Sequence, residues 1–556
     1  MARTTRKEGP EVTTTAGQLQ GSWKDKGSIA VFKGVPYAAP PTGQNRWRPP
    51  APVTPWSGVR NATKDGPSAI QRAAMFDVFI DELVRGQGWN PARTAAMKTL
   101  FTKAPKPKES EDCLHLTVRT PQLGKQAKLP VMVWIHGGDH SDGASSEPFY
   151  ASTALAQQGV VTVLINYRLG LMGYFAHPEL AVESDLSIAG NYGTLDQIAA
   201  LEWVRDNIDN FGGDPDNVTI FGESAGGESV LHLMTTPLAR GLFHRALPQS
   251  PANSCQMMHL RRPFLNYESA EDRSATFANA LGITGPNQIE RLRATSTDDL
   301  YDLVRAAPRL GDHYPVIDGH VIPESPLSAF EGGRQAPVPL IVGSNANEGT
   351  LIGPALDAVM VEYRHQPIPT AGIQPEMAEA FGDDLDRLIE IYPGLDRRNK
   401  QAEIDFIGDH MFGGRAYWYA RNHAAAGHPT WLYMFSRTPP SPTQTGGAYH
   451  AAELPFVHGS NVPVLPLTSE DKVLAGQMQQ YWTSFAKAGD PNVAGRTTWP
   501  GFDEADPQWI NFNHRIEVEP VSRREQYEIF NARTARLVDE MSVDVRPAPP
   551  VSVQAG

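Results

Sequence analysis

The chain has 556 residues, of which 40% are hydrophobic and 20% are charged. These proportions fit a globular protein with a large buried core and argue against wholesale disorder. Its 62 acidic and 49 basic residues give a formal net charge of −13, so the surface should repel phosphate backbones and anionic lipid headgroups, and nucleic acid is not an expected partner.

The N-terminal residues are charged and no long apolar run follows them, which predicts no signal peptide and a cytoplasmic location. A secreted or periplasmic mature form stays open, because a cleaved signal leaves no trace. Apolar runs such as residues 129–135 and 160–165 are far shorter than the roughly 20 residues that span a bilayer, so no membrane span is expected. Cys113 and Cys255 are too few for a disulfide framework and lack the spacing of zinc ligands.

Apolar and β-branched runs alternate with helical patterns along the chain. Buried strands are predicted at residues 131–135, 160–165, 218–221, 340–342 and 431–435, and helices at 195–211, directly after Ser224, and at 471–487, where Gly489 ends the helix. This order predicts an α/β fold with a large, mostly parallel central sheet flanked by helices. No repeat or linker divides the chain, so residues 1–544 are expected to form one domain, with a flexible tail at 545–556.

Residues 218–227 read Val-Thr-Ile-Phe-Gly-Glu-Ser-Ala-Gly-Gly, a predicted strand that runs through Gly-x-Ser-x-Gly into a predicted helix. Gly222 and Gly226 permit a tight turn in which any Cβ would meet neighbouring backbone. That turn lifts Ser224 above the carboxyl edge of the sheet and directs the Ala225 amide at the reaction centre. The alternative is a glycine-rich turn with an idle serine, but the flanking strand and helix favour a nucleophile.

The strand at residues 131–135 is followed by His136-Gly137-Gly138-Asp139. A glycine pair after a buried strand can aim backbone N–H groups into a cleft, where they stabilise the oxyanion of a tetrahedral intermediate, and the loss of one such donor costs about 3 kcal/mol. The alternative is a simple turn after a strand. Gly137, Gly138 and Asp139, with Ala225, are therefore the candidate oxyanion donors.

Several further motifs occur in a fixed order along the chain. They are Phe-Lys-Gly-Val-Pro-Tyr-Ala-Ala-Pro-Pro at 32–41, Arg46-Trp47, Ser-Glu-Asp-Cys-Leu at 110–114, Asn-Tyr-Arg-Leu-Gly at 166–170, Gly-Asn-Tyr-Gly at 190–193, Asp196-Gln197, Tyr481-Trp482 and Phe485-Ala486. Together with the serine turn, they make nearly the whole chain resemble the type B carboxylesterases, a group that includes cholinesterases and bacterial esterases. The resemblance implies an α/β-hydrolase fold with inserted helical cover segments.

The resemblance also implies a glutamate and a histidine downstream of the serine. Gly-Ser-Asn-Ala-Asn-Glu-Gly at 343–349 is similar to the family's acid motif, and Tyr-His-Ala-Ala-Glu-Leu-Pro at 449–455 is similar to its histidine loop. Glu348 is thus the candidate acid and His450 the candidate base. His458 lies eight residues later and is expected to be an ordinary exposed polar residue.

In these roles, His450 accepts the proton of Ser224 as the hydroxyl attacks an ester carbonyl, and Glu348 orients the imidazole. The expected activity is hydrolysis of small-molecule carboxylic esters through an acyl-enzyme, with no metal or organic cofactor. One alternative is a specialised hydrolase of one bulky ester, amide or carbamate. Another is a non-catalytic binding module, which the presence of all three residues disfavours. The sequence leaves monomer and homo-oligomer equally open.

The family that the chain resembles usually has a cysteine partner upstream of the one at Cys113, and residues 66–71 contain none. The following stretch, residues 70–108, is long and has a helical pattern, so it is either a mobile cover over the active site or a plain surface insertion. Within it, Trp89 is a candidate for stacking on a substrate ring, and core packing is the alternative.

Asp139 stands where many relatives have a third glycine. A carboxylate beside a developing oxyanion raises the reaction barrier unless it points away from Ser224 or is paired, and the neighbouring His140 is a candidate partner. His140 and Glu223 are also candidate substrate-binding residues. For Glu223, an organising role in the pocket wall is favoured over tuning of the local field.

Overall fold

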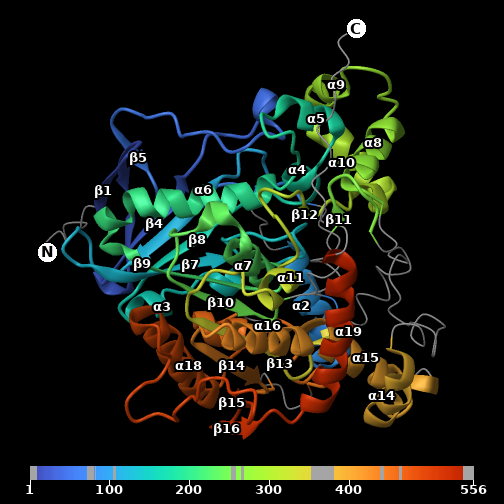
Figure 1. The fold of residues 1–556 in the computed structure, drawn as a ribbon. Coiled ribbons are helices and arrows are strands. Elements are labelled where there is room, and N and C mark those ends of the chain that lie inside the picture. Colours follow the sequence, from blue (N-terminus) through green and yellow to red (C-terminus); the bar gives the residue numbers. More distant parts are fainter. Residues whose placement is uncertain are drawn as a thin grey trace, which may run out of the picture.

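The computed structural model of the chain describes residues 9–71, 81, 83–103, 108–251, 258–264, 268–351, 381–397, 399–438, 444–462 and 466–542. An 11-stranded sheet forms its centre (Figure 1). In spatial order, the strands are β16 (Ile516–Pro520), β15 (Gln508–Phe512), β14 (Thr430–Phe435), β13 (Leu340–Asn345), β10 (Arg245–Gln249), β9 (Gly213–Glu223), β7 (Leu129–Ile135), β8 (Val161–Ile165), β6 (His115–Thr120), β4 (Ile29–Pro36) and β3 (Ser22–Lys24).

The seven neighbouring strands from β15 to β8 run parallel to one another. Antiparallel pairing adds β16 at one edge and β6, β4 and β3 at the other. The mostly parallel sheet expected from the sequence is therefore confirmed. Two small sheets lie apart from it: β1 (Glu11–Thr14), β2 (Gly17–Gln20) and β5 (Val59–Asn61) form one, and β11 (Met258–His259) and β12 (Val316–Ile317) form the other.

Helices cover both faces of the central sheet, because successive side chains of a buried strand point to opposite faces. In β7, Val131, Val133 and Ile135 pack into one hydrophobic cluster, and Met132 and Trp134 pack into another. The first cluster involves α6 (Tyr192–Asn207), α7 (Ala225–Thr235), α11 (Pro326–Glu331), α16 (Gly414–Ala425) and α19 (Arg524–Ser542), and the second involves α3 (Ala154–Gln157), α17 (Leu454–His458) and α18 (Ser469–Ala488).

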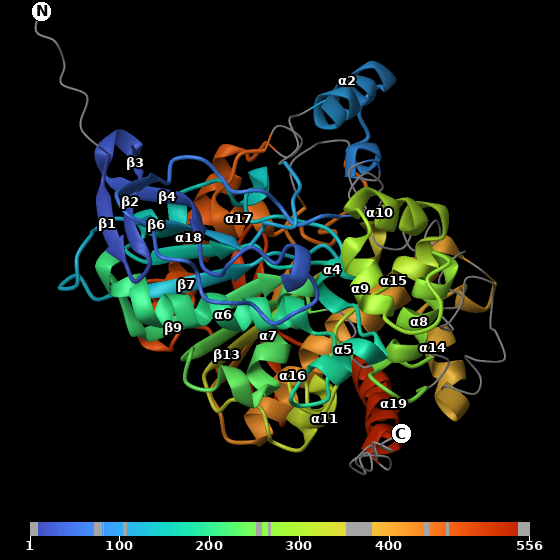
Figure 2. The same ribbon diagram turned by 90° about the horizontal axis from the view of Figure 1, so that it is seen from above.

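A third cluster lies to one side of the sheet and is built largely from short helices (Figure 2). Its helices are α4 (Gly170–Tyr174), α5 (Pro178–Glu183), α8 (Ala270–Ala280), α9 (Gln288–Ala294) and α10 (Thr297–Ala306). The remaining helices described here are α2 (Pro91–Lys103), α14 (Leu385–Ile391) and α15 (Lys400–Gly408).

The strands and helices predicted from the sequence are confirmed, and their ends differ by a few residues. The helix predicted at 195–211 begins three residues earlier as α6, and residues 208–211 form a 3-10 turn. Helix α18 begins with a capping box formed by Thr468 and Asp471 and ends at Gly489, whose φ of 75° only glycine adopts without strain.

The 70–108 segment contains α2, which stands out from the body of the molecule (Figure 2). At the base of this segment, Leu83 and Val84 are buried in the same cluster as α17 and α18. The Gly86 carbonyl oxygen accepts a hydrogen bond from the Thr445 amide at 2.9 Å. The segment is therefore docked beside the chain that leads to His450, while its role as a cover stays a prediction, and residues 72–80, 82 and 104–107 lie outside the described residues.

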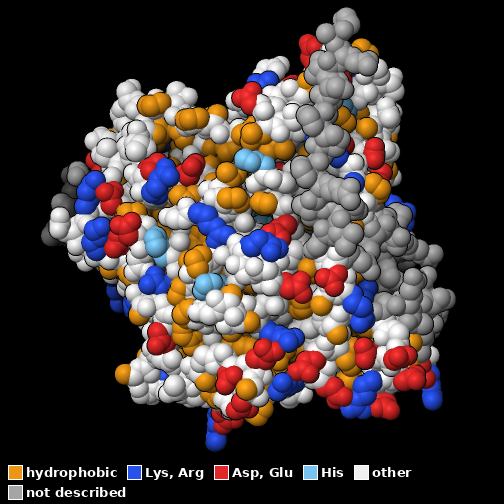
Figure 3. Space-filling model, viewed as in Figure 1, with side chains coloured by type: hydrophobic (Ala, Val, Ile, Leu, Met, Phe, Trp, Pro, Cys, Tyr) orange, Lys and Arg blue, Asp and Glu red, His pale blue; other side chains and the backbone are white. Residues whose placement is uncertain are grey.

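On the face shown in Figure 3, acidic and basic side chains are interspersed. Within the described parts of the chain, no helix has both the length and the apolar character needed to cross a bilayer.

Candidate active site

The serine turn lies at the carboxyl end of the sheet, between β9 and α7. Ser224 itself has φ 58° and ψ −127°, a strained combination for a residue with a side chain. A Cβ on Gly222 would lie 2.5 Å from a backbone atom of Gly226 and 2.7 Å from the Ile135 carbonyl oxygen, so only glycine fits. The Ser224 amide donates to the Gln249 carbonyl oxygen at 3.0 Å, which fixes the turn to β10.

His450 and Glu348 lie on neighbouring loops, the first after β14 and the second after β13. Asn347 and Tyr449 form a β-bridge between these loops. The Nδ1 atom of His450 lies 2.6 Å from Oε2 of Glu348, and both side chains are buried. A carboxylate at Nδ1 holds the proton on that nitrogen and leaves Nε2 free to accept one.

The other carboxylate oxygen of Glu348 is held by two donors. Oε1 accepts hydrogen bonds from the Ser250 hydroxyl and from the backbone amide of Asn345, each at 2.6 Å. Both donors sit at ends of parallel strands, β10 and β13, so the sheet itself sets the orientation of this carboxylate.

Glu223 lies on the opposite side of the imidazole. Its Oε1 is 3.2 Å from Nε2 of His450, which places the histidine at the serine turn. Burial alone would lower the pKa of the His450 imidazole, but the carboxylates of Glu223 and Glu348 outweigh burial and raise this pKa to about 9. Burial also raises the pKa of the Glu223 carboxyl well above its usual value, although the neighbouring His450 imidazolium acts to lower it.

A third buried carboxylate, that of Glu453, completes the surroundings of the histidine. Its oxygens accept hydrogen bonds from the side-chain amide of Gln249 at 3.1 Å and from the side-chain amide of Asn345 at 2.6 Å. Gln249 in turn accepts from the Trp482 indole at 3.2 Å. Sequence reasoning gave Glu453 and Gln249 no role, although Glu453 falls within the histidine motif three residues after His450.

The predicted oxyanion loop lies directly against the serine turn. It follows β7, which pairs in parallel with β9 so that Ile135 lies opposite Gly222. A Cβ on Gly137 would lie 3.1 Å from Cβ of Ser224, and a Cβ on Gly138 would collide with the Asp142 carbonyl oxygen. Gly138 and Asp139 both have positive φ, 103° and 54°. The four candidate oxyanion donors therefore belong to two segments that meet at Ser224.

The Asp139 side chain is exposed, and its Oδ2 accepts a hydrogen bond from the Tyr314 hydroxyl at 3.0 Å. His140, by contrast, is buried, with Nε2 3.5 Å from Oε2 of Glu228 and Nδ1 3.4 Å from the Tyr174 hydroxyl. The neutral hydroxyl of Tyr314 is thus one partner of the Asp139 carboxylate. No motif in the sequence around Tyr314 predicted this contact.

Two other histidines are structural. His136 stacks on Tyr167 with ring centroids 4.6 Å apart, and burial lowers the pKa of its imidazole to about 4. His458 was expected to be exposed, and this was wrong: it is 3% exposed and contacts Trp134 edge to face at 4.4 Å. It terminates the short helix α17, whose apolar residues carry it into the core.

Trp89 is half-buried and packs against the cluster of α17 and α18. The guanidinium carbon of Arg93 lies 4.1 Å from its ring centroid. These contacts agree with the packing alternative, and the predicted stacking on a substrate ring stays a prediction.

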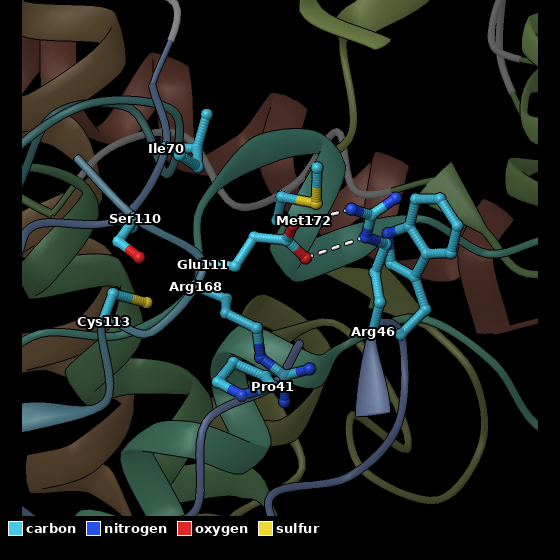
Figure 4. Close-up of a pocket in the computed structure, with 10 residues that line it drawn as sticks. Pro41, Arg46, Ile70, Ser110, Glu111, Cys113, Arg168 and Met172 are labelled. Atoms are coloured by element: carbon cyan, nitrogen blue, oxygen red, sulfur yellow. Dashed lines mark hydrogen bonds and ion pairs between the residues drawn. The ribbon is translucent and has the colours of Figure 1, made fainter. Parts of the chain in front are cut away.

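A small cavity lies away from the serine turn, where the two ends of the 70–108 segment join the body of the protein near Ile70 and Ser110 (Figure 4). Figure 4 shows Glu111 pointing toward Arg46, and the two form a bidentate ion pair at 2.6 and 2.8 Å. Arg168 pairs in the same way with the buried Asp196. The Cys113 thiol at this cavity is free and buried, and burial raises its pKa. Cys255 lies outside the described residues. Among the residues that the structure describes, no group of three or more His, Cys, Asp or Glu side chains is arranged to hold a metal ion.

Comparison with known proteins gives consistent matches over most of the chain. The sequence profile described as "Carboxylesterase family" matches residues 8–530. The chain is 33% identical to fumonisin B1 esterase of Sphingopyxis macrogoltabida over 88% of this chain and 84% of that protein. It is 34% identical to para-nitrobenzyl esterase of Bacillus subtilis over 93% and 97%. A solved structure of a PNB esterase superposes with a TM-score of 0.73 at 32% identity, covering 94% of this chain and 99% of that chain.

Proposed function

The chain belongs to the carboxylesterase family, and from this premise we propose that Ser224, His450 and Glu348 are its catalytic triad. The protein is a carboxylic ester hydrolase with an α/β-hydrolase fold. The observation that carries the triad assignment is the 2.6 Å contact from Glu348 to Nδ1 of His450, whose Nε2 reaches the serine turn.

In the proposed reaction, Nε2 of His450 accepts the Ser224 proton as the hydroxyl oxygen attacks the ester carbonyl. The negative charge that develops on the carbonyl oxygen is stabilised by amides of Gly137, Gly138, Asp139 and Ala225. The imidazolium then protonates the leaving alcohol. His450 next takes a proton from water as this water attacks the acyl carbonyl. The imidazolium then returns the proton to Oγ of Ser224 as the bond from Oγ to the acyl group breaks and the acid leaves, and Glu348 stabilises the imidazolium in both steps.

Labelling with a fluorophosphonate probe tests this assignment, because the probe reacts only with an activated serine. We expect one equivalent of label per chain, and peptide mapping should place it on Ser224. Label on another serine, or no label on a protein that hydrolyses esters, contradicts the proposal.

The pH dependence of kcat/KM should reflect the raised pKa of His450. As a base, the imidazole must be neutral, so kcat/KM should rise with pH. The pH at which kcat/KM reaches half its plateau should lie above 6.5, the reference pKa of histidine, because the pKa of His450 is raised to about 9. Glu223→Gln removes one carboxylate next to Nε2, destabilises the imidazolium and should shift this limb to lower pH.

Glu228→Gln is the matched control, since Glu228 lies near His140 and not at the His450 contacts. Rate profiles measured with a non-ionising ester should therefore coincide for this variant and the wild type. If the acidic limb of the kcat/KM profile lies at the same pH in Glu223→Gln and in the wild type, the Glu223 carboxylate does not raise the pKa of His450.

Asp139 is proposed to favour cationic esters, because its carboxylate is exposed on the loop that follows β7 and presents a negative charge close to the serine turn. Asp139→Asn should lower kcat/KM several-fold for positively charged esters only, and the loss should shrink at high salt. Asp139→Gly also removes the side-chain bulk, so it should additionally favour esters of bulky alcohols. Equal effects of both variants on all esters would leave Asp139 as a structural residue of the loop.

A specialised hydrolase of one bulky ester, amide or carbamate is the alternative proposal, and the acyl and alcohol groups that the enzyme prefers separate the two. The names of the two relatives given above point to quite different esters, so kinetics with esters of graded acyl and alcohol size are the direct approach. One domain over residues 1–544, a tail at 545–556 and a cytoplasmic location likewise stay predictions; residues 543–556 lie outside the described residues.

A further inference from the structure

A π-helical turn lies next to the triad. Helices α15 and α16 follow each other without a break, and the π-helical turn η10 (Asp409–Gly413) joins them. Turns of this kind are rare and occur frequently at functional sites, because the extra residue redirects a side chain. Here the turn carries Phe412, which is 2% exposed, and its ring centroid lies 4.6 Å from that of the His450 imidazole at an interplanar angle of 39°.

The turn is fixed to the same loop that carries Glu348. A Cβ on Gly408, just before the turn, would lie 2.7 Å from the Gly349 amide nitrogen and 3.4 Å from Cβ of Glu348. The backbones therefore touch directly. Helix α15 consequently cannot move without displacing the acid loop, and the position of Phe412 is set relative to the triad.

A buried polar network anchors the turn from the other side. The Asp409 carboxylate accepts from the Tyr392 hydroxyl at 2.8 Å and forms an ion pair with Arg523. Arg523 also donates to the Ala346 carbonyl oxygen at 2.7 Å, two residues before Glu348. The first residue of the π-helical turn and the start of the acid loop thus share one guanidinium group.

We propose that Phe412 is a positioning residue for the catalytic base: its ring holds the plane of the His450 imidazole and stabilises the imidazolium that forms when the Ser224 proton is transferred. This inference rests on the proposed triad. An aromatic ring within about 6 Å of a cation attracts it through the ring quadrupole, most strongly where water is excluded. The charged groups that face the imidazole are Glu223 at the end of β9, Glu348 after β13 and Glu453 before α17, and Phe412 adds an apolar contact.

Phe412→Leu tests the proposal, since leucine keeps an apolar side chain and removes the π-system. The imidazolium loses one stabilising contact, so the acidic limb of kcat/KM should move to lower pH by about half a unit to one unit. kcat should fall about 10- to 100-fold with KM nearly unchanged, because the base is both weaker and less well held. Phe412→Tyr restores a ring and should return the limb to its wild-type position.

Phe406→Leu is the matched control. Phe406 is a buried phenylalanine of α15 that stacks on His410, with centroids 5.8 Å apart and planes at 3°. Loss of the Phe406 ring perturbs helix α15 and leaves the Phe412 ring against His450. The acidic limb of kcat/KM should therefore lie at the same pH as in the wild type. If the leucine variant at 412 does not fold, Phe412→Met is measured in its place.

Two results overturn the proposal: a lowered kcat with an unshifted limb in Phe412→Leu, or the same limb shift in Phe406→Leu. Both leave the triad untouched as long as the fluorophosphonate still labels Ser224, so failure of this inference is distinguishable from failure of the proposed function.

Discussion

Ser224→Ala is expected to lower kcat for p-nitrophenyl esters by about 10⁶-fold, as removal of the nucleophile does in other serine hydrolases that rely on a triad. The residual rate comes from the oxyanion donors and from binding. The fold should be unaffected, because the turn geometry depends on glycines and on the Ser224 amide, not on its hydroxyl. Initial rates and thermal melting of purified protein give both quantities, and the variant should no longer take up the fluorophosphonate.

Ser229→Ala is a suitable control for that variant. Ser229 is a buried serine of α7 whose hydroxyl accepts from the Gln197 amide, so its loss disturbs packing without touching the chemistry. The residues of a triad act as a unit, and His450→Ala should therefore match Ser224→Ala within about tenfold, with little further loss in the double variant. Additive losses, or a Ser224→Ala enzyme that keeps more than a few per cent of activity, contradict the assignment.

Glu348→Gln is expected to lower kcat by about 10⁴-fold while leaving substrate binding and stability nearly unchanged. Oε1 of Glu348 faces two donors, Ser250 and the Asn345 amide, so the carbonyl oxygen of the glutamine must take that position. Its NH₂ group then points at Nδ1 of His450. This nitrogen is forced to accept, the proton moves to Nε2, and the imidazole no longer accepts the serine proton.

The tautomer change separates this explanation from a simple loss of charge. Glu348→Asp keeps the negative charge on a shorter side chain, so it should lose far less activity than Glu348→Gln. The ¹⁵N chemical shifts of the His450 ring should show a proton on Nδ1 in the wild type and on Nε2 in the glutamine variant. Equal losses in the two variants would instead assign the effect to position alone.

Local patterns predicted the elements that carry Ser224 and part of the proposed triad. Short runs of β-branched residues and the Gly-x-Ser-x-Gly turn have a fixed relation to backbone geometry, so Ser224 and its strand followed from the sequence alone. His450 and Glu348 were proposed only through motifs of the family, because nothing in the local chain distinguishes one loop histidine from another.

Contacts between distant segments were beyond local reasoning. Tyr314 meets Asp139 across 175 residues, and Phe412 meets His450 from a π-helical turn that no local pattern in the sequence predicted. His458 follows the same logic, since a histidine in a short apolar helix is buried or exposed according to what packs on it. Such pairings depend on how helices and strands are arranged in the complete fold.

The order in which the strands enter the sheet has a consequence for biosynthesis. Ser224 leaves the ribosome well before His450, and at usual rates of synthesis the two emerge roughly 10 to 45 s apart. Strand β13 and Glu348 emerge about midway through this interval, and β14 and His450 follow only towards its end, so the proposed base is missing until then. The nascent chain should therefore carry an ordinary, unreactive serine, and the nucleophile gains its reactivity only when the C-terminal strands dock on the sheet. Synthesis itself thus delays the appearance of a reactive group until the surroundings that control it have been built.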